Sequence, residues 1–149
     1  MRRFGPALAG LALSSAAATA CPVGLAVVRA GDGTVVFVAQ ADEFSLSYRH
    51  SVTLTPVTAR YVIAPDGTLT QTEERFAAHG PGLAHDGEGW RRDGDSFVLP
   101  LKREIGRLIV RTAPEHENRL IIADTRIDLA AWPGEPLHLM PMACEDALQ

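Results

Sequence analysis

A two-residue alternation in residues 44–54 constrains the fold of this chain more than any other feature. From Phe44 to Leu54, the large apolar side chains alternate with serine, threonine or arginine. This period is typical of a β-strand with one buried face, because successive side chains of a strand point to opposite sides. The alternation also places His50 on the apolar face. The sequence therefore predicts a strand that aims one polar ring into the core.

The rest of the chain after the N-terminal region also predicts short strands joined by tight turns. Gly31-Asp-Gly33 and Pro65-Asp-Gly67 each separate two strand-like segments and carry the residues that hairpin turns favour. No segment shows the sustained 3.6-residue period of a long helix. We therefore expect an all-β fold, a single-domain antiparallel sandwich or small barrel of about eight short strands.

The first twenty residues have the pattern of a secretory signal peptide. Arg2 and Arg3 precede an apolar run over residues 4–18, and Ala18-Thr-Ala20 is a small-residue cleavage site. A buried N-terminal helix would not explain this order of charge, apolar run and small residues. The pattern predicts a signal peptide over residues 1–20, a single β domain over residues 21–149, and a periplasmic or otherwise exported protein.

The two cysteines stand at opposite ends of the predicted mature chain. Cys21 would be its first residue, and Cys144 lies close to the C-terminus. In an oxidising compartment they can form a disulfide that closes almost the whole chain. Alternatively, Ala18-Thr-Ala-Cys21 is a degenerate lipobox and Cys21 is lipidated, which would attach the protein to a membrane. Two free thiols are the third alternative.

The predicted register of the second hairpin adds further polar residues to the inner face. If Ala64 lies opposite Thr68, an uninterrupted register places Ala59 opposite Glu73. Glu73 and Arg75 then share the apolar face. Burying such groups is unfavourable unless they are paired or face a cavity. Either a hydrogen bond between His50 and Glu73 fixes the core, or these residues line a ligand-binding pocket.

The segment between residues 76 and 96 is long for a connection, which favours a functional loop that folds over the sheet. Gly80 and Gly82 would allow such a fold-back. The side chains of His79, His85, Asp86 and Glu88 match no established metal-ligand spacing, so we predict a solvated loop and no metal site. A serine hydrolase is disfavoured, because His50 and Ser51 point to opposite faces of a strand.

Several sequence blocks resemble one bacterial family. They are Phe44-x-Leu-x-Tyr-x-His-Ser-Val52, Thr55-Pro-Val57, Glu73-x-Arg-Phe76 and Gly80-Pro-Gly-Leu83, followed by Leu99-Pro-Leu101 and His116-x-x-x-Leu120. The chain is similar in these blocks to the family called domain of unknown function 1850. Members are small exported proteins associated with tripartite (TRAP-type, TAXI) uptake transporters. The resemblance implies a role in the uptake of small organic acids, with the TRAP transporter membrane subunits as partners.

Our leading interpretation is an exported, non-enzymatic accessory or small-ligand-binding protein linked to a TRAP-type organic-acid uptake system. The alternatives are an enzyme that uses His50 and Glu73 as an acid–base pair and a purely structural envelope protein. No catalytic residue, cofactor or nucleic-acid partner is assigned; the net charge of −4 disfavours nucleic acid. The candidate ligand-binding residues are Tyr48, His50, Ser51, Glu73, Arg75, His79, Gly80 and Gly82.

Overall fold

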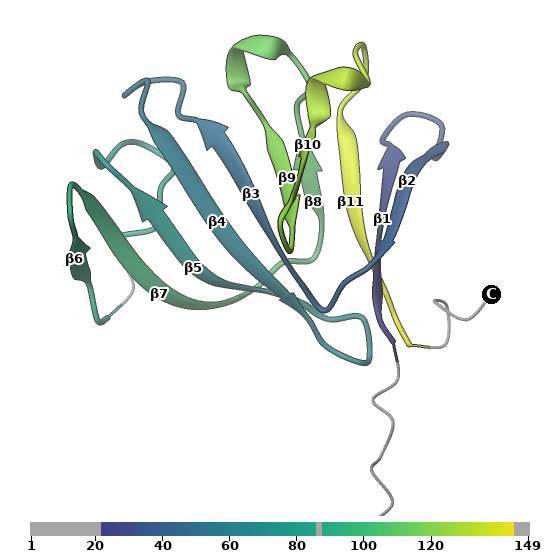
Figure 1. Ribbon diagram of the computed structural model, residues 1–149, viewed down its shortest axis with the longest axis horizontal. Helices are drawn as coiled ribbons and strands as arrows, with labels where there is room; N and C mark the ends of the chain where they lie inside the picture. The colour runs from purple at the N-terminus through teal and green to yellow at the C-terminus, as the bar shows by residue number, and fades with distance from the viewer. Residues whose placement is uncertain (1–21, 86–87, 145–149) are drawn as a thin grey trace, which may run out of the picture.

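The described chain forms two antiparallel sheets that pack as a sandwich (Figure 1). The computed structural model describes residues 22–85 and 88–144. The strands are β1 (Gly24–Arg29), β2 (Val35–Gln40), β3 (Glu43–Arg49), β4 (Pro56–Ile63), β5 (Leu69–Phe76), β6 (Arg91–Asp93), β7 (Ser96–Glu104), β8 (Leu108–Val110), β9 (Arg119–Ile122), β10 (Thr125–Asp128) and β11 (Leu137–Met142). Two 3₁₀ turns, η1 (Pro114–His116) and η2 (Leu129–Ala131), complete the elements.

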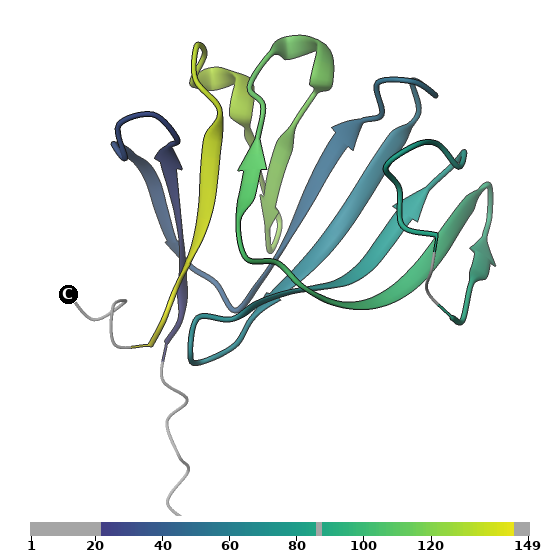
Figure 2. The same ribbon diagram turned by 180° about the vertical axis from the view of Figure 1, so that it is seen from behind.

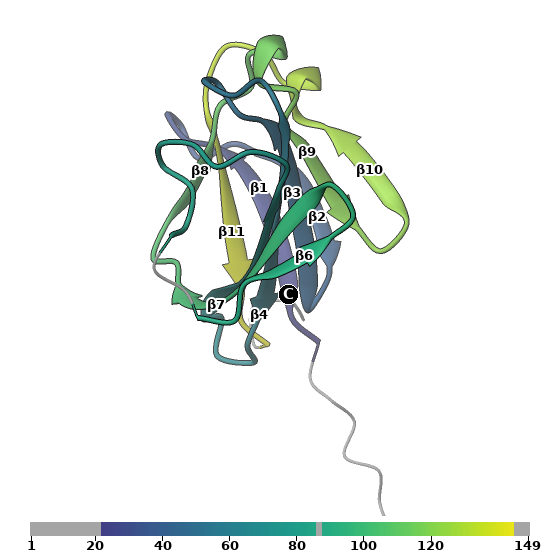
Figure 3. The ribbon, with the colours of Figure 1, turned by 90° about the vertical axis from the view of Figure 1, so that its left-hand side faces the viewer.

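The two sheets differ in width. The smaller sheet has the order β2-β1-β11-β8, and the larger has the order β10-β9-β3-β4-β5-β7-β6. Figure 3 looks from the side of β6 and shows the smaller sheet behind the larger one. The predicted all-β class is thus confirmed. The architecture is a sandwich and not a closed barrel, with eleven strands in the described part of the chain in place of about eight.

Side-chain alternation explains why these segments are strands. In β4, Val57, Ala59, Tyr61 and Ile63 are all buried, and the residues between them are partly or fully exposed. The first two hairpins turn where the sequence predicts. Asp32 Oδ1 accepts a hydrogen bond from the backbone N–H of Thr34 at 2.9 Å, and Asp66 does the same for Thr68. Each aspartate side chain thus stabilises the backbone of its own turn.

The register predicted for the second hairpin is correct near the turn and wrong beyond it. Ile63 lies opposite Leu69 and Tyr61 opposite Gln71, as expected. Between the pairs Tyr61–Gln71 and Arg60–Glu73, a β-bulge in β5 then shifts the pairing by one residue, with Thr72 as the extra residue. Ala59 therefore lies opposite Glu74, and Glu73 lies opposite Arg60. A one-residue shift exchanges the faces of a strand, so Glu74 is the carboxylic acid that enters the interior.

The predicted strand of residues 44–54 is shorter than its alternation. Phe44 and Leu46 face the core as predicted, but β3 ends at Arg49 and a turn follows. Val52 and Leu54 are 65% and 58% exposed, so their predicted place on the apolar face is wrong. The chain reverses here because the backbone N–H of Leu54 donates to the carbonyl of His50 at 2.9 Å. The apolar–polar alternation of the sequence therefore continues beyond Arg49, where the β-strand itself ends.

The core has two parts because the larger sheet extends beyond the smaller one. The main cluster packs between the sheets and includes Leu25, Val27, Phe44, Leu120 and Leu139. A second cluster contains Val57, Phe76 and Leu83, with Tyr48 and Phe97 packed against it. Leu83 belongs to the loop of residues 77–85, which follows β5. Figure 2 shows this segment turning back beside β4 and β5 before the chain reaches β6.

Candidate functional site

His50 is the buried polar residue on which the site is built, and it lies one residue after the end of β3. The ring is 6% exposed and makes three hydrogen bonds. The Nδ1 atom accepts from the backbone N–H groups of Val52 at 3.2 Å and Thr53 at 3.1 Å. The Nε2 atom lies 3.0 Å from the carbonyl of Pro81. Because Nδ1 accepts twice, the ring is neutral and Nε2–H donates to Pro81. His50 thus joins the turn after β3 to the loop of residues 77–85.

The loop approaches His50 so closely that only glycine fits at position 80. A Cβ atom added to Gly80 would lie 2.7 Å from Cε1 of the His50 ring and 3.0 Å from Cγ2 of Thr53. Both distances are at or below the limit of ordinary contact between carbon atoms. Gly80 therefore allows the Pro81 carbonyl to reach the His50 ring. The glycine is needed for this close approach, and not for flexibility of the loop.

Glu74 holds the other end of the same loop. The side chain is 5% exposed, and its Oε2 atom accepts a hydrogen bond from the backbone N–H of Ala84 at 2.7 Å. Two tyrosines share this region. Burial, with a smaller contribution from the Glu74 carboxylate, raises the pKa of Tyr61 to about 12 and raises the pKa of Tyr48 from its ordinary value of 10.0. Both hydroxyl groups therefore stay protonated at neutral pH.

An open cleft lies beside this tied loop, with a volume of about 370 Å³. One wall is the end of β3 and the turn after it, and the second is the tip of the loop of residues 77–85. The third wall is formed by β8 and the segment around η1. The lining residues are Leu46, Tyr48, Arg49, His50, Ser51, Pro81, Gly82, Leu83, Ile109, Val110, Arg111, His116 and Asn118. The volume falls at the lower end of the range of small-molecule sites.

The charged groups on the cleft wall are basic. Arg49 and Arg111 line it together with His116, and no Asp or Glu is among the described residues that line it. Arg49 also contacts Glu117, whose carboxylate lies 3.7 Å from Arg49 and 3.6 Å from Arg119 outside the cleft. The Asn118 side chain donates to the carbonyl of Arg111 at 2.7 Å, which fixes the backbone that carries the second arginine. Apolar walls combined with basic side chains suit an organic anion.

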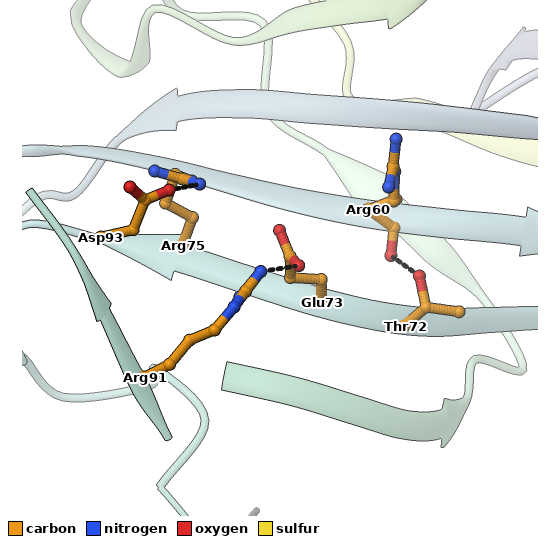
Figure 4. Close-up of polar contacts among 6 residues, drawn as sticks. All are labelled: Arg60, Thr72, Glu73, Arg75, Arg91 and Asp93. Carbon is orange, nitrogen blue, oxygen red and sulfur yellow. Dashed lines mark hydrogen bonds and ion pairs between the residues drawn. The ribbon is translucent and has the colours of Figure 1, made fainter. Parts of the chain in front are cut away.

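Glu73 and Arg75 do not belong to this cleft, which corrects the prediction that they face inward. Both lie on the outer face of the larger sheet, because the bulge reverses their side (Figure 4). Arg91 Nη2 donates to Glu73 at 3.0 Å, and Arg75 Nη2 donates to Asp93 at 2.6 Å. The pKa of Asp93 is held below its ordinary value by that bond to Arg75. The predicted contact between His50 and Glu73 is therefore wrong.

The ion pairs Glu73–Arg91 and Arg75–Asp93 join β5 to β6 and cover β7, which lies between these two strands. Arg75 lies opposite Val98 of β7, and Val98 lies opposite Arg91 of β6. Val98 alternates with Phe97 and Leu99, which face inward with Phe76 and Glu74. Val98 consequently lies on the outer face and yet is 0% exposed. The crossed pairs thus cover an apolar residue on the solvent side of the sheet.

The remaining candidates divide between the cleft and its surroundings. Tyr48, His50, Ser51 and Gly82 line the cleft as a group. Gly80 supports it through the contact with His50. His79 is exposed and packs against the rings of Phe76 and Trp90, away from the lining. No three potential metal ligands gather in the described ranges, and no helix there is long and apolar enough to cross a membrane.

Sequence reasoning missed the basic residues and the buried acid. Arg111 and His116 come from a segment far from His50 in the chain, and only the pairing of β3 with β9 brings that segment alongside. Arg49 was on the polar face by its alternation, but it reaches the cleft because β3 ends there. Glu74 was missed because the bulge, which turns its side chain inward, could not be predicted. Cys21 and the predicted signal peptide lie outside the described residues, so the disulfide, lipid and free-thiol alternatives stay predictions.

Comparisons with known proteins agree with the resemblance noted in the sequence. The family model described as "Domain of unknown function (DUF1850)" matches residues 44–129, which is more than half of the chain. No curated protein and no solved structure matches the chain. The matched range runs from β3 to η2 and contains every residue that lines the cleft. The chain therefore belongs to the DUF1850 family.

Proposed function

We propose that this protein is an exported accessory protein of a TRAP-type (TAXI) uptake system, and that the cleft binds a small organic acid. The observation that carries the proposal is the pairing of apolar walls with Arg49 and Arg111 in a cleft of about 370 Å³. The carboxylate would bind the arginine side chains by charge-assisted hydrogen bonds. The carbon skeleton would rest against Leu46, Leu83 and Ile109.

The tyrosine and histidine at the cleft extend this recognition. The Tyr48 hydroxyl keeps its proton, because burial raises its pKa, so it can donate to an anion. His116 lines the cleft from the wall around η1. His50 is not free to bind through nitrogen, since both ring nitrogens already have protein partners. Its role in binding is to hold the wall in place.

No observation favours the alternative enzyme with a His50–Glu73 acid–base pair. The two side chains make separate contacts, with Pro81 and Arg91 respectively. Neither nitrogen of His50 is left to exchange a proton with a substrate while these bonds hold. The link to TRAP transporter membrane subunits rests on the sequence resemblance, and the exported location rests on the N-terminal pattern.

Binding to a panel of acids tests the proposal. Isothermal titration calorimetry of the purified protein with succinate, benzoate and octanoate should detect binding of at least one of them. Replacing Arg111→Gln should weaken that binding about tenfold through loss of one charge-assisted hydrogen bond. Arg126→Gln is the matched control, because Arg126 is exposed on β10 and does not line the cleft.

The same variants connect binding to transport. In cells whose own copy carries Arg111→Gln, uptake of the bound acid should fall, whereas Arg126→Gln should leave uptake unchanged. Absence of binding by all three acids would overturn the proposed ligand class. Binding that is equally strong in Arg111→Gln and Arg49→Gln would remove the cleft from the proposal.

A further inference from the structure

A second hollow lies beside the cleft at the end of β3. Its volume is about 290 Å³, and the charged side chains that line it are Arg49, Glu117 and Arg119. Two residues, Tyr48 and Arg49, line both the hollow and the cleft. The end of β3 is therefore a wall that the two spaces share. The Arg49 side chain, which is 41% exposed, stands between an acid in the hollow and any anion in the cleft.

Two arginines of the hollow converge on one carboxylate. Arg119 of β9 lies opposite Ser47 of β3, and Arg49 lies two residues further along the same face of β3. The Glu117 carboxylate places Oε1 at 3.7 Å from Nη1 of Arg49 and Oε2 at 3.6 Å from Nη1 of Arg119. Neither distance is short enough for a hydrogen bond. The Glu117 carboxylate is therefore shared loosely between two guanidinium groups.

The backbone fixes the position of Glu117. This residue ends η1 with φ 49° and ψ 37°, in the left-handed region that residues other than glycine rarely adopt. Its backbone N–H donates to the carbonyl of Pro114 at 3.0 Å. The next residue, Asn118, is buried and is bonded through its side chain to the carbonyl of Arg111. The Glu117 carboxylate is thus held beside Arg49 by an anchored segment.

We propose that Glu117 is an internal competitor of the ligand, whose carboxylate holds Arg49 towards the hollow and so lowers the affinity of the cleft for an organic acid. This inference rests on the proposed function of the cleft. A ligand carboxylate can take Arg49 from Glu117, because it can form charge-assisted hydrogen bonds of about 2.7–2.9 Å. The pair that it replaces is longer and half-exposed, and such pairs contribute little. Glu117 therefore tunes the affinity without preventing binding.

Removal of the competing charge tests this role. Isothermal titration calorimetry with succinate, benzoate and octanoate should show that Glu117→Gln binds the acid about two- to fivefold more tightly than wild type, the range expected for an exposed ion pair. Glu115→Gln is the matched control. It removes the same charge two residues away, from an exposed side chain in η1 that lines neither the cleft nor the hollow. Its affinity for the acid should equal that of wild type.

A double-mutant cycle shows whether the effect passes through Arg49. In an Arg49→Gln background, Glu117→Gln should no longer tighten binding, as measured by NMR titration, which detects weak complexes. A gain that persists without Arg49, or an equal gain in Glu115→Gln, would be a long-range charge effect and would overturn the inference. Wild-type binding that Glu117→Gln leaves unchanged or weakens overturns the inference alone and leaves the cleft as the proposed site. Absence of binding in both wild type and Glu117→Gln overturns both proposals.

Discussion

The His50 ring connects the backbone of the turn after β3 to the loop of residues 77–85. It accepts hydrogen bonds from Val52 and Thr53 and donates one to Pro81. A buried N–H or carbonyl that loses its partner costs more than the bond itself contributed. The contribution of His50 to stability therefore comes mainly from the backbone groups that it satisfies.

Two substitutions separate the two halves of this role. His50→Phe keeps the ring volume but removes all three bonds, so we expect the free energy of unfolding to fall by about 1–3 kcal/mol. His50→Asn should lose less, because an Asn side chain can still accept from the N–H groups two and three residues on, although it cannot reach Pro81. Urea denaturation measures both. Equal stability of wild type and His50→Phe would contradict the role given to the ring.

At the scale of the element, the bulge in β5 decides which of two neighbouring acids supports the fold. Glu74 accepts from Ala84 inside the molecule, and Glu73 pairs with Arg91 outside. Glu74→Ala leaves a buried N–H without an acceptor and should cost about 1–3 kcal/mol. Glu73→Ala removes a surface ion pair and should cost less than about 1 kcal/mol. Thermal unfolding of the two variants gives the comparison. The reverse order would show that the register is uninterrupted.

The same bulge marks where sequence reasoning stops. Alternation and turn residues predict the strands and the first pairs of each hairpin, because both signals are local. A bulge adds one residue to one strand without a distinctive composition, so the faces of Glu73 and Glu74 could not be predicted. The cleft was only half predictable for a related reason. Tyr48, His50 and Ser51 lie on one strand and its turn, whereas Arg111 and His116 arrive through strand pairings that span the chain.

At the scale of the whole molecule, the first and last strands of the described chain pair in the smaller sheet. β1 and β11 pair along their length, with Gly24 opposite Met142. Cys21 precedes this pair closely in the sequence and Cys144 follows it closely, so the register favours the predicted disulfide over two free thiols. Cys144→Ser should then lower the free energy of unfolding by about 2–5 kcal/mol. Guanidinium denaturation of the oxidised protein measures the loss.

The reduced protein is the control for this prediction. If the bridge forms, a reductant should lower the stability of wild type to that of Cys144→Ser and should leave the variant unchanged. Wild-type protein that is equally stable in oxidising and reducing buffer would instead favour lipidation of Cys21 or two free thiols. Intact-mass analysis then distinguishes those two outcomes, because a lipid adds mass and a thiol does not.

The unequal width of the sheets has a consequence for how the protein opens. A sheet that covers a core separates only when its ladder of hydrogen bonds breaks, whereas the loop of residues 77–85 is held over Phe76 chiefly by its bonds to His50 and Glu74 and by Leu83. Such a segment can unfold as a small cooperative unit while the rest stays folded. Because its tip is also a wall of the cleft, a molecule bound there would oppose this local unfolding, and the lifetime of the closed segment would report occupancy.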